Sequence, residues 1–185
     1  PTPPYLLSVT RLIPRKNVHG LIAAYGRCAP DLPWDLVICG SGSELIPLQR
    51  QIAELNLQSR VYWPGFIAYD QMPRWYAHAA AFIHPALSEQ WGLVVNEAAA
   101  AGVPILCSQT VGAAVEMLRD RHNALLFPPD NEMAIAQAIL EIYRMPDAER
   151  QILVWSAQAT VAQYGPKQFA TGFINAASSS FSPYP

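Results

Sequence analysis

The chain has 185 residues, 51% of them hydrophobic and 14% charged, with a formal net charge of −2 at pH 7. This length and composition indicate one compact globular domain and exclude a disordered or fibrous chain. The small net charge excludes a basic face for nucleic acid or an anionic membrane, so a few local cations would have to hold any anionic ligand.

The cysteines and the apolar runs bear on where the protein works. Cys28, Cys39 and Cys107 lie in apolar or helical runs without C-x-x-C spacing, which predicts buried, reduced thiols in a cytoplasmic protein. No apolar run approaches the roughly 18 residues of a membrane span, so no spanning segment is expected. Membrane association of a longer parent protein stays an open alternative. The start at Pro1, close to an apolar run, suggests a fragment cut at a domain boundary.

Short apolar runs alternate along the chain with segments of helical periodicity. Strands that are apolar on both faces predict a parallel sheet covered on each side, and right-handed crossovers make it a doubly wound, Rossmann-like α/β fold. After segment 130–145 the alternation stops, and extra C-terminal helices are expected at 147–165 and 169–177. We expect one domain over 1–177 and a flexible tail over 178–185. The expected strands are 5–10, 34–40, 61–65, 80–86, 104–108 and 123–129, and the helices between them are 19–29, 43–56, 69–79, 92–102 and 112–119.

Cations gather after the first strand, where a ligand is expected. In an open parallel sheet, ligands bind beyond the carboxyl ends of the strands. The segment TRLIPRKN carries Arg11, Arg15 and Lys16 in a chain with only 12 lysines and arginines. Guanidinium forks and a mobile ammonium suit the oxygens of a diphosphate. A solvated basic turn is the alternative.

Small residues follow the second strand. The run GSGS at 40–43 opens a helix and lets backbone N–H groups approach an anion or a ribose. It is not a dinucleotide fingerprint, because Leu45 stands at the third glycine position, and no Gly-Lys-Ser/Thr follows to make a P-loop. A plain strand-to-helix turn is the alternative.

Two glutamates, Glu89 and Glu97, stand eight positions apart in SEQWGLVVNEAAAAGVPIL, residues 88–106. In one continuous helix their carboxylates would lie about 80° apart and roughly 12 Å along the axis. This fits poorly with an acid–base pair that flanks a glycosidic bond, which needs about 5 to 10 Å. We expect Gly92 to begin the helix, with Glu89 in the loop before it and Glu97 about one turn inside.

This layout favours an elongated ligand. Carboxylates accept hydrogen bonds from vicinal hydroxyls, and the unpaired N–H groups of a helix start attract anions. Sugar hydroxyls at one glutamate, phosphate at the helix start and ribose hydroxyls at the other describe a nucleotide sugar. The alternative is a capping role for Glu89 and a solvated Glu97.

The chain resembles the C-terminal, donor-binding domain of a GT-B retaining glycosyltransferase of family 4, the glycosyl transferases group 1. The resemblance covers nearly the whole chain, and the E-x7-E element followed by E-A-x-A-x-G-x-P is highly specific. The matching segments are SVTRLIPRKNVHGLIAAY, LVICGSGSE, VYWPGFI, YAHAAAFIHPALSEQWGLVVNEAAAAGVPILCS, VGAAVEML and NALLFPPDN.

The resemblance implies a role for each matching residue. Arg11 and Lys16 would hold the donor diphosphate and stabilise the leaving group, and Glu89 would contact the donor sugar. These three are the candidate catalytic residues. The donor-binding candidates are Glu97 at the ribose, Gln90, Trp91, Gly92 and Leu93 at hydroxyls and phosphates, Phe66 and Ile67 at the base, and Gly40 and Gly42 on the phosphate side.

The resemblance also implies the reaction and the partners. Retaining members are thought to react by front-face attack, in which the leaving phosphate helps to deprotonate the acceptor. No metal and no cofactor are expected, and the sequence has no Asp-x-Asp triplet. The substrate would be a UDP- or GDP-linked sugar. The acceptor and a catalytic His or Asp would lie on an N-terminal domain absent from this chain, so we expect the isolated chain to bind nucleotide but transfer little sugar.

Some positions depart from the family pattern or stay open. Thr10 replaces a usual glycine and could crowd the phosphate, and Ala124 replaces another glycine. His84 either faces the donor or is a structural histidine at the end of a strand, and Glu116 either braces the site or does not.

Two other functions stay open at this point. One is a nucleotide-sugar epimerase of GT-B architecture, and the other is a non-catalytic nucleotide-binding module. The sequence does not specify the sugar, the nucleotide or the acceptor.

Overall fold

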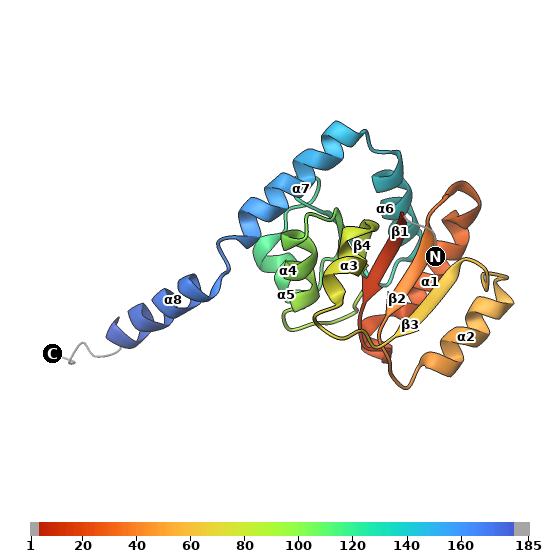
Figure 1. The fold of residues 1–185 in the computed structure, drawn as a ribbon, viewed down its shortest axis with the longest axis horizontal. Helices are drawn as coiled ribbons and strands as arrows, with labels where there is room; N and C mark the ends of the chain where they lie inside the picture. The colour runs from red at the N-terminus through yellow and green to blue at the C-terminus, as the bar shows by residue number, and fades with distance from the viewer. Residues whose placement is uncertain (1–3, 180–185) are drawn as a thin grey trace.

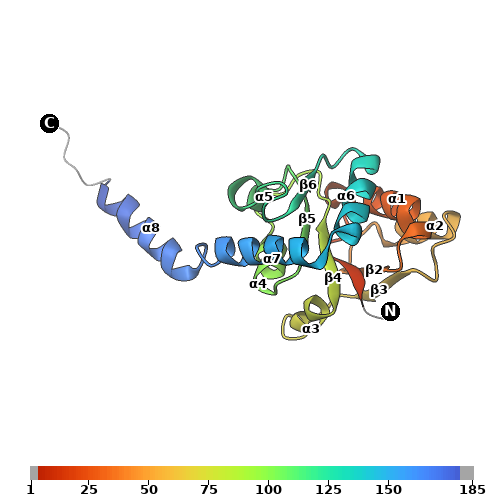
Figure 2. The ribbon, with the colours of Figure 1, turned by 90° about the horizontal axis from the view of Figure 1, so that it is seen from above.

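The computed structural model describes residues 4–179, which form a six-stranded parallel sheet with helices on both faces (Figures 1 and 2). The strand order is β3-β2-β1-β4-β5-β6, so the order reverses between β1 and β4. A crevice for a ligand is expected at such a switch point. The doubly wound α/β prediction is confirmed. The strands are β1 Tyr5–Val9, β2 Asp35–Cys39, β3 Val61–Gly65, β4 Ala79–His84, β5 Ile105–Ser108 and β6 Leu125–Phe127.

Each expected helix is present, and most are shorter than predicted. Expected helix 69–79 begins only at Met72, because a turn precedes it and Pro73 suits a first helical turn. The last strand ends at Phe127, because Pro128 and Pro129 lack the N–H that a ladder needs. The helices are α1 Val18–Cys28, α2 Leu45–Glu54, α3 Met72–Ala77, α4 Leu93–Ala100, α5 Gly112–Met117, α6 Glu132–Arg144, α7 Asp147–Val161 and α8 Pro166–Ser179, with the 3-10 turns η1 Pro14–Lys16 and η2 Ala29–Asp31.

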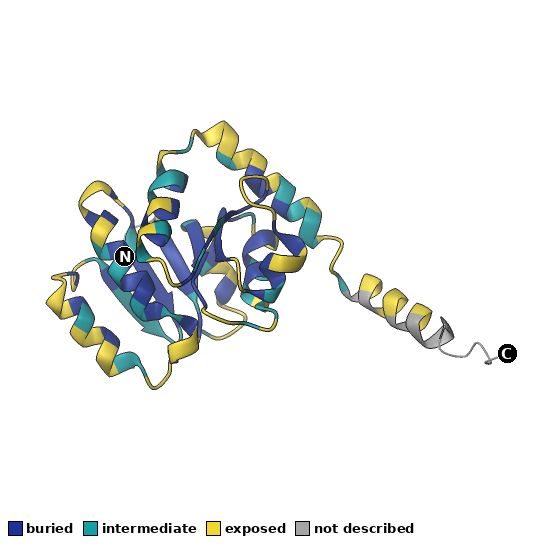
Figure 3. Cartoon of the chain, turned by 180° about the vertical axis from the view of Figure 1, so that it is seen from behind, coloured by how far each residue is buried: buried dark blue, intermediate teal, exposed yellow. Residues whose placement is uncertain are grey.

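The alternation of side chains along the strands builds two apolar layers. Leu6 and Ile38 point to the face covered by α1, α2 and α6, while Leu7 and Phe82 point to the face covered by α3, α4 and α5. Figure 3 shows the strands buried between helices whose outer faces are exposed. This two-sided burial explains why the strands read as continuous apolar runs.

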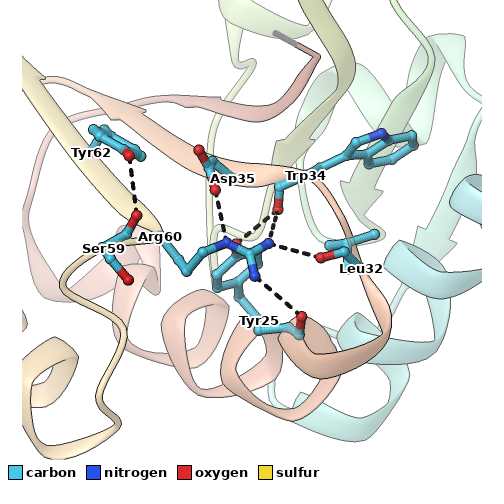
Figure 4. Close-up of polar contacts among 8 residues, drawn as sticks. Tyr25, Leu32, Trp34, Asp35, Ser59, Arg60 and Tyr62 are labelled. Atoms are coloured by element: carbon cyan, nitrogen blue, oxygen red, sulfur yellow. Dashed lines mark hydrogen bonds and ion pairs between the residues drawn. The ribbon is translucent and has the colours of Figure 1, made fainter. Parts of the chain in front are cut away.

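The amino end of the sheet is held by Arg60, which precedes β3 (Figure 4). Its guanidinium donates to Asp35 Oδ1 at 2.8 Å and to the carbonyls of Leu32 at 2.8 Å and Trp34 at 3.0 Å. The Tyr25 hydroxyl also donates to the Trp34 carbonyl, at 2.8 Å. These bonds join α1, β2 and β3 at the end of the sheet opposite the carboxyl ends of the strands.

The C-terminal helices follow the expected pattern, with a later end. Helix α7 packs along α4, and α8 then extends away from the sheet (Figures 1 and 2). Because α8 continues to Ser179, the first two residues of the expected tail 178–185 are helical, and 180–185 lie outside the described residues, as do 1–3. Between residues 4 and 179, no helix combines the length and apolarity needed to cross a membrane.

Candidate functional site

A cavity of about 600 Å³ opens at the carboxyl ends of the central strands. The last residues of β1, β2 and β4, Val9, Cys39 and His84, form part of its lining. All the candidate site residues except Gly42 also line this cavity. They are Arg11, Lys16, Gly40, Phe66, Ile67, Glu89, Gln90, Trp91, Gly92, Leu93 and Glu97.

The η1 turn delivers Lys16 into the cavity. Pro14 opens the turn, and Asn17 closes it in the left-handed region at φ 54°. The Asn17 amide donates to the Pro129 carbonyl at 2.6 Å, which fixes the turn against the loop after β6. As a result Lys16 is buried, while Arg15 remains exposed.

The Lys16 ammonium forms an ion pair with the Glu89 carboxylate, and both side chains are largely buried, at 9% and 14% exposure. The two loops are also joined by their backbones, since Leu87 N–H donates to the Arg15 carbonyl at 2.9 Å. Arg11 lines the same cavity from an exposed position and forms no ion pair within the part of the chain that the structure describes. Positive charge and carboxylate therefore meet at one wall.

The Glu89 loop is anchored to the start of α5. Gly112 N–H donates to the Glu89 carbonyl at 3.0 Å, and Ala113 N–H donates to the Trp91 carbonyl at 2.8 Å. A Cβ atom at Gly112 would lie 1.9 Å from the Gln90 carbonyl oxygen, so only glycine permits this approach. These contacts fix the backbone of the loop that carries Glu89.

Gly92 begins α4, as predicted, and separates the two glutamates. It is the N-cap residue in the left-handed region, at φ 92° and ψ 65°, and α4 starts at Leu93. Glu97 follows one turn inside and accepts a hydrogen bond of 3.0 Å from the Tyr76 hydroxyl. The first N–H groups of α4 lack partners within the helix and lie between the two carboxylates.

Tyr76 is a site residue that sequence reasoning missed. Its ring is buried in the core, and its hydroxyl orients Glu97. Burial, with the Glu97 carboxylate beside it, raises the pKa of Tyr76 above its usual range, so the hydroxyl remains a donor. Nothing in the sequence indicated this contact.

Burial, reinforced by the like charges of Arg15 and Arg11, lowers the pKa of Lys16 to about 8. The Glu89 carboxylate acts in the opposite direction, and the ammonium is the main form at neutral pH. Burial also raises the pKa of the Cys39 thiol to about 12, so this thiol stays protonated in the cavity. Of these two groups, Lys16 therefore has the pKa closer to pH 7.

The loop after β3 forms an apolar wall, of which only Phe66 and Ile67 were predicted. Phe66 and Ile67 line the cavity as expected, and Tyr69 and Met72 line it with them. Phe66 is 80% exposed and Tyr69 81% exposed, although both are aromatic. Tyr69 stands four residues after the predicted strand 61–65, at the first position of the predicted helix 69–79, and nothing in that position marked it as part of the site.

The glycine run after β2 allows two loops to touch. A Cβ atom at Gly40, which has φ 146°, would lie 1.8 Å from the Thr10 carbonyl oxygen, and one at Gly42 would lie 2.2 Å from the Leu12 carbonyl oxygen. Thr10 N–H donates to the Cys39 carbonyl at 2.9 Å across the same contact. Gly42 packs against the first loop and is not among the residues that line the cavity, so its place on the phosphate side stays a prediction.

Gly40→Ala is expected to lower the free energy of unfolding by about 3 kcal/mol, because the added methyl meets backbone that cannot move aside and φ is unfavourable for alanine. Urea denaturation of the purified chain measures the effect. Gly172→Ala is the matched control, since a Cβ there meets nothing within 4 Å and alanine favours a helix. Equal stability of the two variants would contradict this account of the loop contact.

The fold and this cavity define a doubly wound α/β domain with cations and carboxylates at the switch point of its sheet. Residues 1–158 match the family described as Glycosyl transferases group 1, and the chain belongs to this family.

Several relatives have curated names or solved structures. The chain is 32% identical over 161 residues to the probable sucrose-phosphate synthase 3 of Arabidopsis thaliana. This match covers 77% of this chain and 15% of that protein. It is similar in structure to Anabaena Alr3699/HepE in complex with UDP-glucose, with a TM-score of 0.83, 25% identity and coverage of 96% of this chain and 49% of that one. The C-terminal domain of the group 1 glycosyl transferase LpcC from Francisella tularensis shares the fold, at a TM-score of 0.77, 22% identity and coverage of 87% and 86%. The chain thus spans about half of HepE and a small part of the synthase.

Proposed function

We propose that this chain is the donor-binding half of a retaining glycosyltransferase, which moves a hexose-type sugar from a UDP- or GDP-sugar to an acceptor without a bound metal. The observation that carries the proposal is the contact between Lys16 and Glu89 beside the start of α4, with Arg11 on the same cavity. Hydroxyls of the sugar would meet Glu89, the diphosphate would meet the cations, and the ribose would meet Glu97.

The proposed chemistry follows from this order of charges. Negative charge develops on the diphosphate as the glycosidic bond breaks, and Lys16 and Arg11 would stabilise it from fixed positions. The N–H groups at the start of α4 would add to this field. The exposed aromatic wall of Phe66 and Tyr69 would contact the base.

Family membership supports transfer over the alternatives. The matched relatives include a probable sucrose-phosphate synthase and a group 1 glycosyl transferase, whereas an epimerase or a binding module draws no support from them. We propose that the acceptor binds on an N-terminal domain, because the chain covers only part of each of these relatives except the LpcC domain. A cytoplasmic location is proposed from the three free, buried cysteines.

Calorimetric titration of the chain with UDP, GDP and ADP, and then with their sugar conjugates, tests the proposal. We expect one nucleotide to bind at a single site with a Kd in the micromolar to millimolar range, and its sugar conjugate to compete for that site. Sugar transfer by the isolated chain should stay below about 1% of that of the protein that includes the acceptor half. Absence of binding to every one of these ligands would contradict the proposed function.

A further inference from the structure

His84 lines the cavity without a hydrogen-bond partner in the part of the chain that the structure describes. It ends β4, the strand beside β1 at the switch point of the sheet, and it lines the cavity although it is only 1% exposed. Neither Nδ1 nor Nε2 has a hydrogen-bond partner among residues 4–179. Buried polar atoms are nearly always paired, so an unpaired imidazole at a cavity wall indicates a group that a ligand completes.

The imidazole is held in a fixed orientation. Its ring stacks on Phe82 with centroids 6.3 Å apart and an interplanar angle of 9°. Its Nε2 lies 3.6 Å from Glu89 Oε2, which is longer than an N–H···O hydrogen bond. A Cβ atom at Gly92 would lie 3.3 Å from Glu89 Cγ and 3.8 Å from Nε2, so the start of α4 lies directly beside both side chains.

The charge state limits what can bind between these atoms. Burial, and then the nearby Lys16 ammonium, lowers the pKa of His84 to about 4, so the ring is neutral at pH 7 with one donor and one acceptor nitrogen. A hydroxyl can accept from the imidazole N–H and donate to the Glu89 carboxylate. A phosphate oxygen would instead be repelled by that carboxylate.

The geometry assigns a second direct contact for the transferred sugar: His84 Nε2 and the Glu89 carboxylate bind the same sugar hydroxyl. This inference rests on the proposed function, because it requires a nucleotide sugar in the cavity. The contact would make His84 a specificity-determining residue, which reports whether a hydroxyl is present at one position of the sugar.

The test compares free and sugar-linked nucleotides in calorimetry. The probes are UDP with UDP-glucose, GDP with GDP-mannose, and ADP with ADP-glucose, and the pair that wild type binds most tightly is used. His84→Phe keeps an aromatic ring against Phe82 and removes both nitrogens. We expect it to weaken binding of the sugar conjugate about tenfold and to change binding of the free diphosphate less than about twofold.

A matched pair of variants covers the case in which His84→Phe does not fold. Glutamine offers an N–H donor near the position of Nε2, and methionine has nearly the same shape without it. His84→Gln should therefore bind the sugar conjugate several-fold more tightly than His84→Met, with equal affinity of both variants for the free diphosphate.

The outcomes separate this inference from the proposed function. Suppose that wild type binds a sugar conjugate. If the variants then lose the same factor of affinity for the conjugate and for the free diphosphate, or lose affinity for neither of the two, His84 has only a structural role and the inference is overturned. If wild type binds none of the six probes, the proposed function fails first. Sugar conjugates that each lack one hydroxyl then identify the contact: the conjugate without the contacted hydroxyl should bind wild type and His84→Phe with equal affinity. If every such conjugate still binds His84→Phe more weakly than wild type, the hydroxyl contact is overturned.

Discussion

Glu89→Gln is expected to lower sugar transfer about 100-fold or more in the protein that joins this domain to its acceptor half, while UDP binds as tightly as before or more tightly. The carboxylate would accept hydrogen bonds from the donor sugar, and the loss of one such polar contact in a preorganised site costs this order of rate. The free nucleotide lacks the sugar and loses nothing.

The rise in affinity for UDP has a separate cause. The Glu89 carboxylate forms an ion pair with the Lys16 ammonium and places negative charge beside the expected phosphate position. A neutral amide removes both effects, so the gain should reach up to about tenfold. Turnover and calorimetry of the same variant measure the two quantities. Glu54→Gln, at an exposed position of α2, is the control, and a parallel loss of transfer and UDP binding would argue against this role.

Lys16→Met should weaken UDP binding about 100-fold, or about 2.7 kcal/mol. The substitution removes a buried ammonium and leaves the Glu89 carboxylate unpaired next to the phosphates. Lys167 is the chain's other lysine, and Lys167→Met on α8 should bind UDP as wild type does. Similar affinities of the two lysine variants for UDP would contradict a direct role of Lys16 in binding the diphosphate.

Because the Lys16 ammonium can lose its proton, the affinity for UDP-glucose should depend on pH. The diphosphate of UDP-glucose itself carries no group that titrates above pH 7. Because the pKa of Lys16 is lowered to about 8, the unliganded domain loses this proton above pH 8 and must regain it to bind the anion. Affinity should be constant near pH 7 and fall up to about tenfold per pH unit between about pH 8 and 9.5. Lys16→Met should give a flat profile over this range, and a flat wild-type profile would exclude the coupling.

The fold could be predicted because its signals are local. Each strand is a short apolar run buried on both faces, and each helix has its own periodicity, so the order of elements followed directly. Boundaries were less exact where a turn precedes Met72 and where Pro128 ends the last strand. Parallel topology then predicted that the loop of Lys16 and the loop of Glu89 meet at one edge of the sheet.

The atomic contacts of the site could not be predicted, because they depend on how loops pack. The direct pairing of Lys16 with Glu89 requires the η1 turn, and the hydrogen bond from Tyr76 to Glu97 requires α3 to lie beside α4. The resemblance implied that Gly42 lies on the phosphate side, and only the structure shows that the Leu12 carbonyl lies close against it. The burial of His84 against the cavity likewise appears only in three dimensions.

A crystal structure of the domain with its tightest-binding nucleotide sugar tests the central claim most directly. We predict phosphate oxygens within hydrogen-bond distance of Lys16 and Arg11, the sugar against Glu89, and the ribose hydroxyls at Glu97. A diphosphate bound away from Lys16, for example in the cavity beside Arg150 and Trp34 at the opposite end of the sheet, would contradict the account.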